Sequence, residues 1–363
     1  MLEPTDGVAA CIVATRGEPW SGVGLMARQR RSQTPATHIR GLLRPVASCC
    51  IVMLGLLRSA GAALPATARI VYSSADDMRA LNRELFATDG TGAETHRLTD
   101  SPATDAYPRW SPDGQRILFL STRGGPTDVY VMNASNGRIR QLTDDDAKEY
   151  PADWAPNGRH IAFAATRGGS SNIFVMEIDG GAERQVTDSP GVKYSVAWAP
   201  DGLSILFSAD VRDVVGRQIW KVDAEGLRPP RRITDAPGSQ MQPAWSPGGR
   251  QIAWVSASQE EHLYVADDEG ANARRITRVA GLYLHPVWIS AEEIAVLHRG
   301  DDGSGIYTLE ADGTRGLRHE VPLHPTAGSF DVTLEPLPVS RRRAFATSLG
   351  RIKGSALSEA RRR

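Results

Sequence analysis

The stretch "YPRWSPDGQRILFLSTR" (Tyr107–Arg123) decides the fold of this chain. It places a four-residue turn, Ser111–Gly114, between a tryptophan and an apolar run. Proline at the second turn position presets φ, aspartate favours the turn, and glycine adopts the conformation that closes it. A copy, "YPADWAPNGRHIAFAATR" (Tyr150–Arg167), repeats the arrangement with its tryptophan 44 residues later. The copy predicts a repeat architecture.

A short apolar-Thr-Asp triplet gives the repeat its frame. The triplet occurs four times and in a decayed fifth copy, at intervals of 44, 44, 47 and 43 residues. A tryptophan follows the first residue of each triplet by 12 positions, at Trp110, Trp154, Trp198, Trp245 and Trp288. We expect these tryptophans to pack in the core or between repeat units.

Each unit reads as four β-strands separated by turns. Apolar runs and period-2 alternation mark the strands, as in "RILFLS" and "DVYVMN" of the first unit. No segment keeps a 3.6-residue period for three turns, which excludes a helical solenoid. Units of this length, built from four short strands, predict an all-β fold, a β-propeller of four-stranded antiparallel blades.

The two ends of the repeat set the number of blades. The first unit begins at "RIVYSS" (Arg69–Ser74) and lacks an inner strand, while one strand is left over at "SFDVTLEPLP" (Ser329–Pro338). The spare strand predicts a six-bladed propeller in which the C-terminal strand completes the first blade. This closure leaves no free sheet edge across the ring.

The flanks of the repeat predict three regions. Residues 1–62 carry arginines followed by the apolar run Val46–Leu57 and small residues, which is typical of a secretory signal cut near Ala60–Ala62. Ala66–Ala68 is an alternative cleavage site. An uncleaved membrane anchor is the second interpretation of this segment. Translation from Met26 would give a signal peptide of more ordinary length. Residues 63–338 form the propeller, and residues 339–363 form a basic, disordered tail. We expect no membrane span after cleavage.

The distribution of charge bears on the partners. The chain is neutral, but residues 1–62 carry +4 and residues 339–363 carry +7, which leaves −11 for the middle. An acidic body argues against nucleic acid as a partner. All three cysteines lie in the first fifty residues, so the body has no disulfide. We expect an exported, periplasmic or secreted monomer.

The repeat "LTDSPATDAYPRWSPDGQRILFLSTRGGPTDVYVMNASNG" (residues 98–137) resembles the WD40-like PD40 repeat of TolB propellers. The resemblance covers about residues 70–338 and excludes the α/β domain that TolB carries ahead of its propeller. It implies a six-bladed propeller in the periplasm that binds a protein without catalysing a reaction. It also implies a role in the Tol-Pal envelope system, with a Pal-like lipoprotein as partner.

Two positions of each inner strand are candidate partner-binding residues at the mouth of the central channel. They vary between units, whereas the tryptophan and the turn do not. Period-2 alternation predicts that both lie on one side of the strand. Five residues before the tryptophans lie Asp105, Glu149, Lys193, Gln240 and Tyr283. Three residues before lie Tyr107, Pro151, Ser195, Gln242 and His285.

Other chemistry is weakly represented in the sequence. Asp105 and Glu149 come from adjacent units and are weak candidates for Ca²⁺ ligands, because hard oxygen donors suit that ion. We expect no other cofactor. No G-x-S-x-G or H-E-x-x-H motif occurs. The alternative to a binding protein is a glycan-binding propeller, or a hydrolase or lyase, that uses the same two carboxylates.

Overall fold

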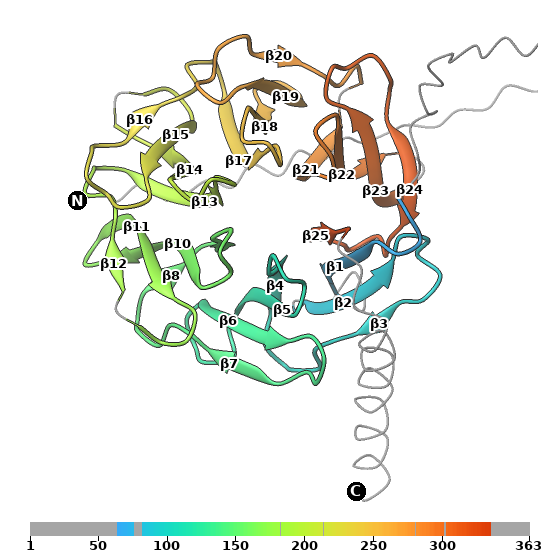
Figure 1. The fold of residues 1–363 in the computed structure, drawn as a ribbon, viewed down its shortest axis with the longest axis horizontal. Helices are drawn as coiled ribbons and strands as arrows, with labels where there is room; N and C mark the ends of the chain where they lie inside the picture. The colour runs from blue at the N-terminus through green and yellow to red at the C-terminus, as the bar shows by residue number, and fades with distance from the viewer. Residues whose placement is uncertain are drawn as a thin grey trace, which may run out of the picture. The chain divides into compact units, whose positions relative to one another are not determined.

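The computed structural model describes residues 64–75, 82–181, 183–212, 214–279, 281–300 and 303–334. The predicted leader (1–62) and basic tail (339–363) lie outside these residues. The described strands form six antiparallel sheets arranged around a central axis (Figure 1). The predicted six-bladed propeller is therefore confirmed.

The first three blades show the regular pattern and one departure from it. From the axis outward, blade 1 consists of β25 (Ser329–Thr333), β1 (Arg69–Ser74), β2 (Glu84–Asp89) and β3 (His96–Arg97). Blade 2 consists of β4 (Asp105–Trp110), β5 (Arg116–Ser121), β6 (Asp128–Asn133) and β7 (Ile139–Gln141). In blade 3 the inner strand is split, and the pieces are β8 (Lys148–Glu149) and β9 (Asp153–Trp154), followed by β10 (His160–Arg167), β11 (Ser170–Glu177) and β12 (Arg184–Gln185).

The remaining three blades repeat the regular pattern. Blade 4 consists of β13 (Val192–Trp198), β14 (Ser204–Asp210), β15 (Gln218–Asp223) and β16 (Arg231–Arg232). Blade 5 consists of β17 (Ser239–Trp245), β18 (Gln251–Ala257), β19 (Glu261–Asp267) and β20 (Arg274–Arg275). Blade 6 consists of β21 (Leu282–Trp288), β22 (Glu293–Gly300), β23 (Gly303–Glu310) and β24 (Arg318–Pro322).

The C-terminal strand closes the ring as the sequence predicts. β25 pairs antiparallel with β1, and Phe330 lies opposite Tyr72 in the register. The hydroxyl groups of Ser73 and Ser329 are 2.7 Å apart, and both side chains are buried. Phe330 is only 1% exposed and packs in the core that blades 1 and 6 share. The strand ends at Thr333, earlier than the predicted Pro338.

The first described residues already belong to this core. Leu64 is 5% exposed, packs in the same cluster as Phe330, and its amide donates to Glu320. The propeller core therefore includes residues that precede β1.

The threonine of each triplet forms a hydrogen bond to the third strand of its blade. Its hydroxyl oxygen accepts the backbone N–H of a residue early in the third strand, at 2.9–3.1 Å in five blades. A buried N–H without such an acceptor costs about 1–3 kcal/mol. The constancy of this threonine therefore reports a backbone requirement of the fold. The five pairs are Leu85 with Thr99, Val129 with Thr143, Ile173 with Thr187, Ile219 with Thr234, and Leu263 with Thr277.

The turns after the inner strands surround one end of the central channel, which we name the turn end. In blades 2 to 5 the turn is closed by a glycine with positive φ, and these are Gly114, Gly158, Gly202 and Gly249. A Cβ on Gly202 would lie 3.4 Å from Pro156 of the preceding blade's turn. Gly158 and Pro112 approach in the same way, so successive turns contact one another around the ring.

Three of the five tryptophans connect neighbouring blades, as predicted. The indole N–H of Trp154 donates to the carbonyl of Arg109 on the inner strand of blade 2, at 3.2 Å. Trp245 and Trp288 donate in the same way, each to the inner strand of the preceding blade.

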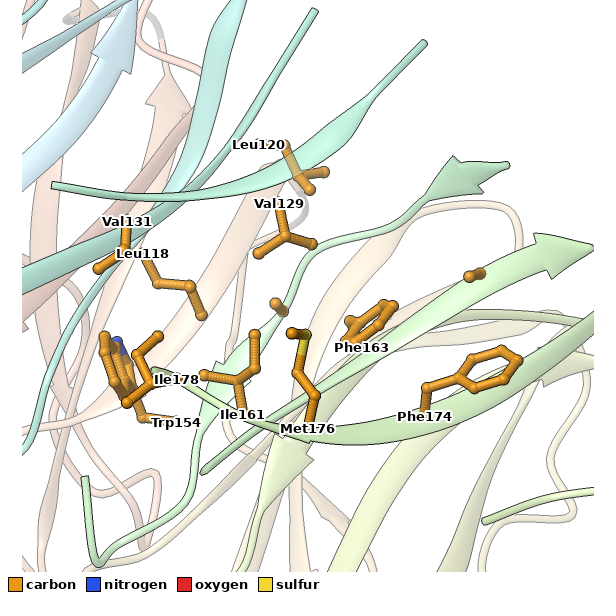
Figure 2. Packing of buried hydrophobic residues seen from close by; sticks show 12 residues of the cluster. Leu118, Leu120, Val129, Val131, Trp154, Ile161, Phe163, Phe174, Met176 and Ile178 are labelled. Atoms are coloured by element: carbon orange, nitrogen blue, oxygen red, sulfur yellow. The ribbon is translucent and has the colours of Figure 1, made fainter. Parts of the chain in front are cut away.

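Apolar side chains fill the space between adjacent blades. Figure 2 shows one such layer, in which side chains of β5 and β6 face those of β10 and β11 beside Trp154. Full burial of one large apolar side chain contributes about 1.5–3 kcal/mol. No helix in the part of the chain that the structure describes is long and apolar enough to cross a membrane.

Candidate functional site

The first candidate position of each inner strand is buried at the seam between blades. Its five residues are 0–1% exposed, and they are Asp105, Glu149, Lys193, Gln240 and Tyr283. In three blades the backbone N–H of this residue donates to a carbonyl at the start of the preceding blade's third strand. The pairs are Asp105 with Arg83, Glu149 with Thr127, and Gln240 with Arg217. The expectation that this position faces the channel mouth together with the second position therefore does not hold.

In blades 4 to 6 the side chain at this position donates hydrogen bonds to backbone carbonyls of the loop that precedes the inner strand. Lys193 donates to the carbonyls of Ser189 and Gly191, and burial lowers its pKa to about 8. The Tyr283 hydroxyl donates to the carbonyl of Val279 at 2.6 Å. Gln240 uses its amide in the same way, on Pro237. The variation between these blades reflects different ways to satisfy loop carbonyls.

In blades 2 and 3 the same position holds a carboxylate beside an arginine. Asp105 pairs with Arg123 at 2.6 Å, and Arg123 also lies over the ring of Tyr130. Glu149 lies 3.7 Å from Arg167, and among the described residues neither of its carboxylate oxygens has a hydrogen-bond partner. Burial, Asp145 and Asp128 raise the pKa of Glu149 to about 8.

The second candidate position lies on a bulge that points into the channel. In blades 2, 4, 5 and 6 the pairing of the inner strand shifts register here, which interrupts the alternation assumed from the sequence. Tyr107, Gln242 and His285 have φ of 55°, 53° and 53°. Only four non-glycine residues of the described part have positive φ, and three of them are at this position.

Contacts across the channel connect these residues. Tyr107 of blade 2 and His285 of blade 6 belong to non-adjacent blades, yet their rings are 5.5 Å apart. The His285 amide donates to the Gln242 side chain at 2.8 Å, and the Tyr107 amide donates to Ser329 at 2.9 Å. We name the three strained residues, Tyr107, Gln242 and His285, the channel collar, and the end of the channel that they occupy the mouth.

The collar combines an exposed and a buried part. Tyr107 is 39% exposed, whereas His285 is 6% exposed. Burial, together with the Arg109 guanidinium, lowers the pKa of His285 to about 3, so its ring is neutral near pH 7. Ser195 lies at the same position of blade 4 and its hydroxyl is 3.0 Å from that of Ser208, while Pro151 lies in the break of blade 3.

The candidate calcium ligands do not form a recognisable metal site. The Asp105 carboxylate already pairs with Arg123. Over the residues that the structure describes, no group of three or more His, Cys, Asp or Glu side chains is arranged to hold a metal ion.

A second constellation, which the sequence reasoning missed, lies in the channel between the collar and the turn end. Arg109 of blade 2 approaches Asp331 of blade 1 at 3.5 Å and lies close enough to Asp153 of blade 3 to affect its charge. Asp331 accepts the backbone N–H of Trp110, and Asp153 accepts that of Trp198. Burial raises the pKa of both carboxyls, that of Asp331 to about 6.

This constellation borders a cavity of about 180 Å³. The other walls come from inner strands and turns, and they include Trp198, Pro200, Pro243, Trp245, Pro286 and Trp288. The residue just before each tryptophan is charged in blades 2 and 3 but apolar in blades 4 to 6. This contrast is the sequence signal that could have identified Arg109 and Asp153.

Three comparisons show which known proteins the chain resembles. The family model of the TolB beta propeller domain, PD40, matches residues 51–163 and 149–234. The Tol-Pal system protein TolB of Roseobacter denitrificans is 39% identical over 69 residues, which are 19% of this chain and 16% of that protein. The chain thus matches only a small part of the length of this curated relative.

Solved structures share the fold at low identity. TolB from Acinetobacter baumannii superposes with a TM-score of 0.61 at 19% identity, over 72% of this chain and 65% of that one. Hydrazine synthase from Kuenenia stuttgartiensis superposes with a TM-score of 0.62 at 16% identity, over 76% and 48%. Proteins of different activity thus share this architecture. The two matches to the family model together cover half of the chain, which therefore belongs to the TolB beta propeller domain family.

Proposed function

We propose that the protein is an exported, non-enzymatic propeller that binds a protein partner at the channel mouth through the collar. The main observation behind this proposal is that three non-glycine residues with positive φ occupy the same position of their inner strands. Such a conformation costs about 1–3 kcal/mol per residue and persists where the surrounding structure enforces it, often at binding sites. The half-exposed ring of Tyr107 is the anchor that a partner would cover.

The surroundings of the collar also suit a protein partner. Val192, Val215 and Val279 lie in or beside loops at the mouth and are 38%, 87% and 68% exposed. Exposed apolar side chains and an exposed aromatic ring on one face are typical of protein interfaces. The curated relative named above belongs by name to the Tol-Pal system. A periplasmic role and a Pal-like lipoprotein as partner are therefore part of the proposal.

The alternative, a glycan-active propeller, depends on Asp105 and Glu149 as accessible carboxylates. Both are buried, and Asp105 is already engaged by Arg123. A general acid or nucleophile has to reach the glycosidic bond. The geometry therefore supports protein binding better than glycan hydrolysis.

Binding of a purified Pal-like lipoprotein from the same organism tests the proposal. Truncation of a central aromatic anchor typically costs at least about 2 kcal/mol of binding free energy, so Tyr107→Ala should weaken binding more than tenfold. Leu203→Ala is the matched control, because Leu203 is 71% exposed but lies in a turn at the turn end. Equal affinities of the two variants would place the interface elsewhere.

A further inference from the structure

We propose that the cavity at the turn end of the channel binds an organic cation, an ammonium or guanidinium group. The site is separate from the collar and consists of Asp153, Asp331 and the adjoining tryptophan and proline walls. It therefore goes beyond the proposed binding of a protein at the mouth.

The charges that border the cavity favour a further cation. Two carboxylates, Asp153 and Asp331, face one guanidinium, that of Arg109. His285 lies near Arg109 and is neutral near pH 7, so it does not balance the second carboxylate. The two carboxylates also repel each other, and each raised pKa reflects the cost of keeping the charge buried. A second positive group in the cavity would relieve that cost.

The walls favour an organic cation over an inorganic one. Trp198, Trp245 and Trp288 border the cavity, and a tryptophan ring attracts a cation by about 0.5–2 kcal/mol, as the Trp245 ring already does with Lys221 Nζ at 5.2 Å. Metal ions of the calcium type need six or more oxygen ligands, and within the described ranges no group of three or more His, Cys, Asp or Glu is placed to hold one. An apolar ligand would leave two buried carboxylates without compensation.

The volume sets the size of the ligand. A cavity of about 180 Å³ has room for about six water molecules at about 30 Å³ each. A tetramethylammonium ion or one basic side chain fits that space, whereas a folded segment does not. Pro200 belongs to the turn after the inner strand of blade 4, so the cavity reaches the turn end of the channel.

The cation has two possible sources with the same chemistry. It can come from outside, as a free ammonium compound or a basic side chain of another molecule. It can also come from this chain, because Asp331 lies on β25 and the sequence "SRRR" with Arg341, Arg342 and Arg343 follows that strand.

Titration of the full chain with tetramethylammonium and with arginine methyl ester, followed by tryptophan fluorescence, tests the proposal. Sodium chloride at equal ionic strength corrects for screening. Asp153→Asn combined with Asp331→Asn keeps an oxygen that accepts each of the two backbone N–H groups, and should weaken binding about tenfold or more because it removes both negative charges. Asp201→Asn, in the exposed turn beside Pro200, should leave binding unchanged.

A full-length variant with Arg341, Arg342 and Arg343 changed to Gln distinguishes the sources. Binding that tightens in this variant means that the chain's own arginines occupy the cavity. Equal binding in both proteins means an external cation. If neither protein binds either cation, or if the Asp153/Asp331 variant binds as the wild type does, the proposal is wrong.

Discussion

The two ends of the inner strands differ in the contacts that neighbouring blades make. At the turn end, glycines contact the prolines of neighbouring turns and tryptophan indoles donate to neighbouring carbonyls. At the mouth, each blade differs: blades 2 and 3 bury carboxylates beside arginines, and blades 4 to 6 tie down their loops with Lys193, Gln240 and Tyr283.

This contrast shows where repeat symmetry is enforced. The turns of blades 2 to 5 approach one another closely in the same way, so their residues are uniform. The mouth only requires that buried polar groups find partners, which many side chains can provide. Backbone strain is found at the mouth, in the three residues of the collar.

The largest expected effect concerns β25, which reaches from one end of the channel to the other. Phe330→Ala should lower the free energy of unfolding by about 3–5 kcal/mol, because it removes a fully buried ring from the seam between blades 1 and 6. Leu334→Ala, next to the strand and 38% exposed, should change it by less than about 0.5 kcal/mol. Urea unfolding of both variants measures the difference, and similar losses would argue against closure through β25.

The second effect concerns the protonation of Glu149, which is buried in blade 3. Burial, Asp145 and Asp128 raise the pKa of Glu149 from 4.5 to about 8, so the folded protein holds a proton that the unfolded chain releases. Stability should therefore fall as pH rises from 4.5 to about 8. Glu149→Gln should flatten this dependence in urea unfolding at pH 5 and pH 8. The exposed Glu94→Gln control should keep the wild-type slope.

The third effect tests the close contacts between turns at the turn end. Gly202 has φ of +76° and lies against Pro156, so Gly202→Ala should cost about 1–2 kcal/mol of stability. Gly248 has open space around its Cβ position and no positive φ, and Gly248→Ala should be neutral or slightly stabilising. Thermal melting compares the two variants. Equal midpoints would mean that the turn at Gly202 accommodates a side chain.

The smallest effect measures strain at the mouth. At position 107, with φ of 55°, glycine should be more stable than alanine by about 1 kcal/mol. At the buried neighbour Ala106, whose φ is not positive, glycine should instead be less stable than alanine by about 1 kcal/mol. Unfolding of Tyr107→Gly, Tyr107→Ala and Ala106→Gly gives both differences. A preference for alanine at position 107 would remove the strain argument.

The sequence by itself determined the repeat, the four strands of each blade, the turns and the closure by the C-terminal strand. These features follow from local rules, because proline and glycine fix turn geometry and the apolar pattern fixes the strands. The constant tryptophans also indicated the seams between blades, which the bonds of Trp154, Trp245 and Trp288 confirm.

Only the tertiary structure decided which side chains meet in the channel. The bulge in the inner strands breaks period-2 alternation, so Asp105 is buried at a seam while Tyr107 faces the channel. Arg109, Asp153 and Asp331 come from three different blades. Their proximity depends on how the blades curve around the channel, which no local pattern encodes.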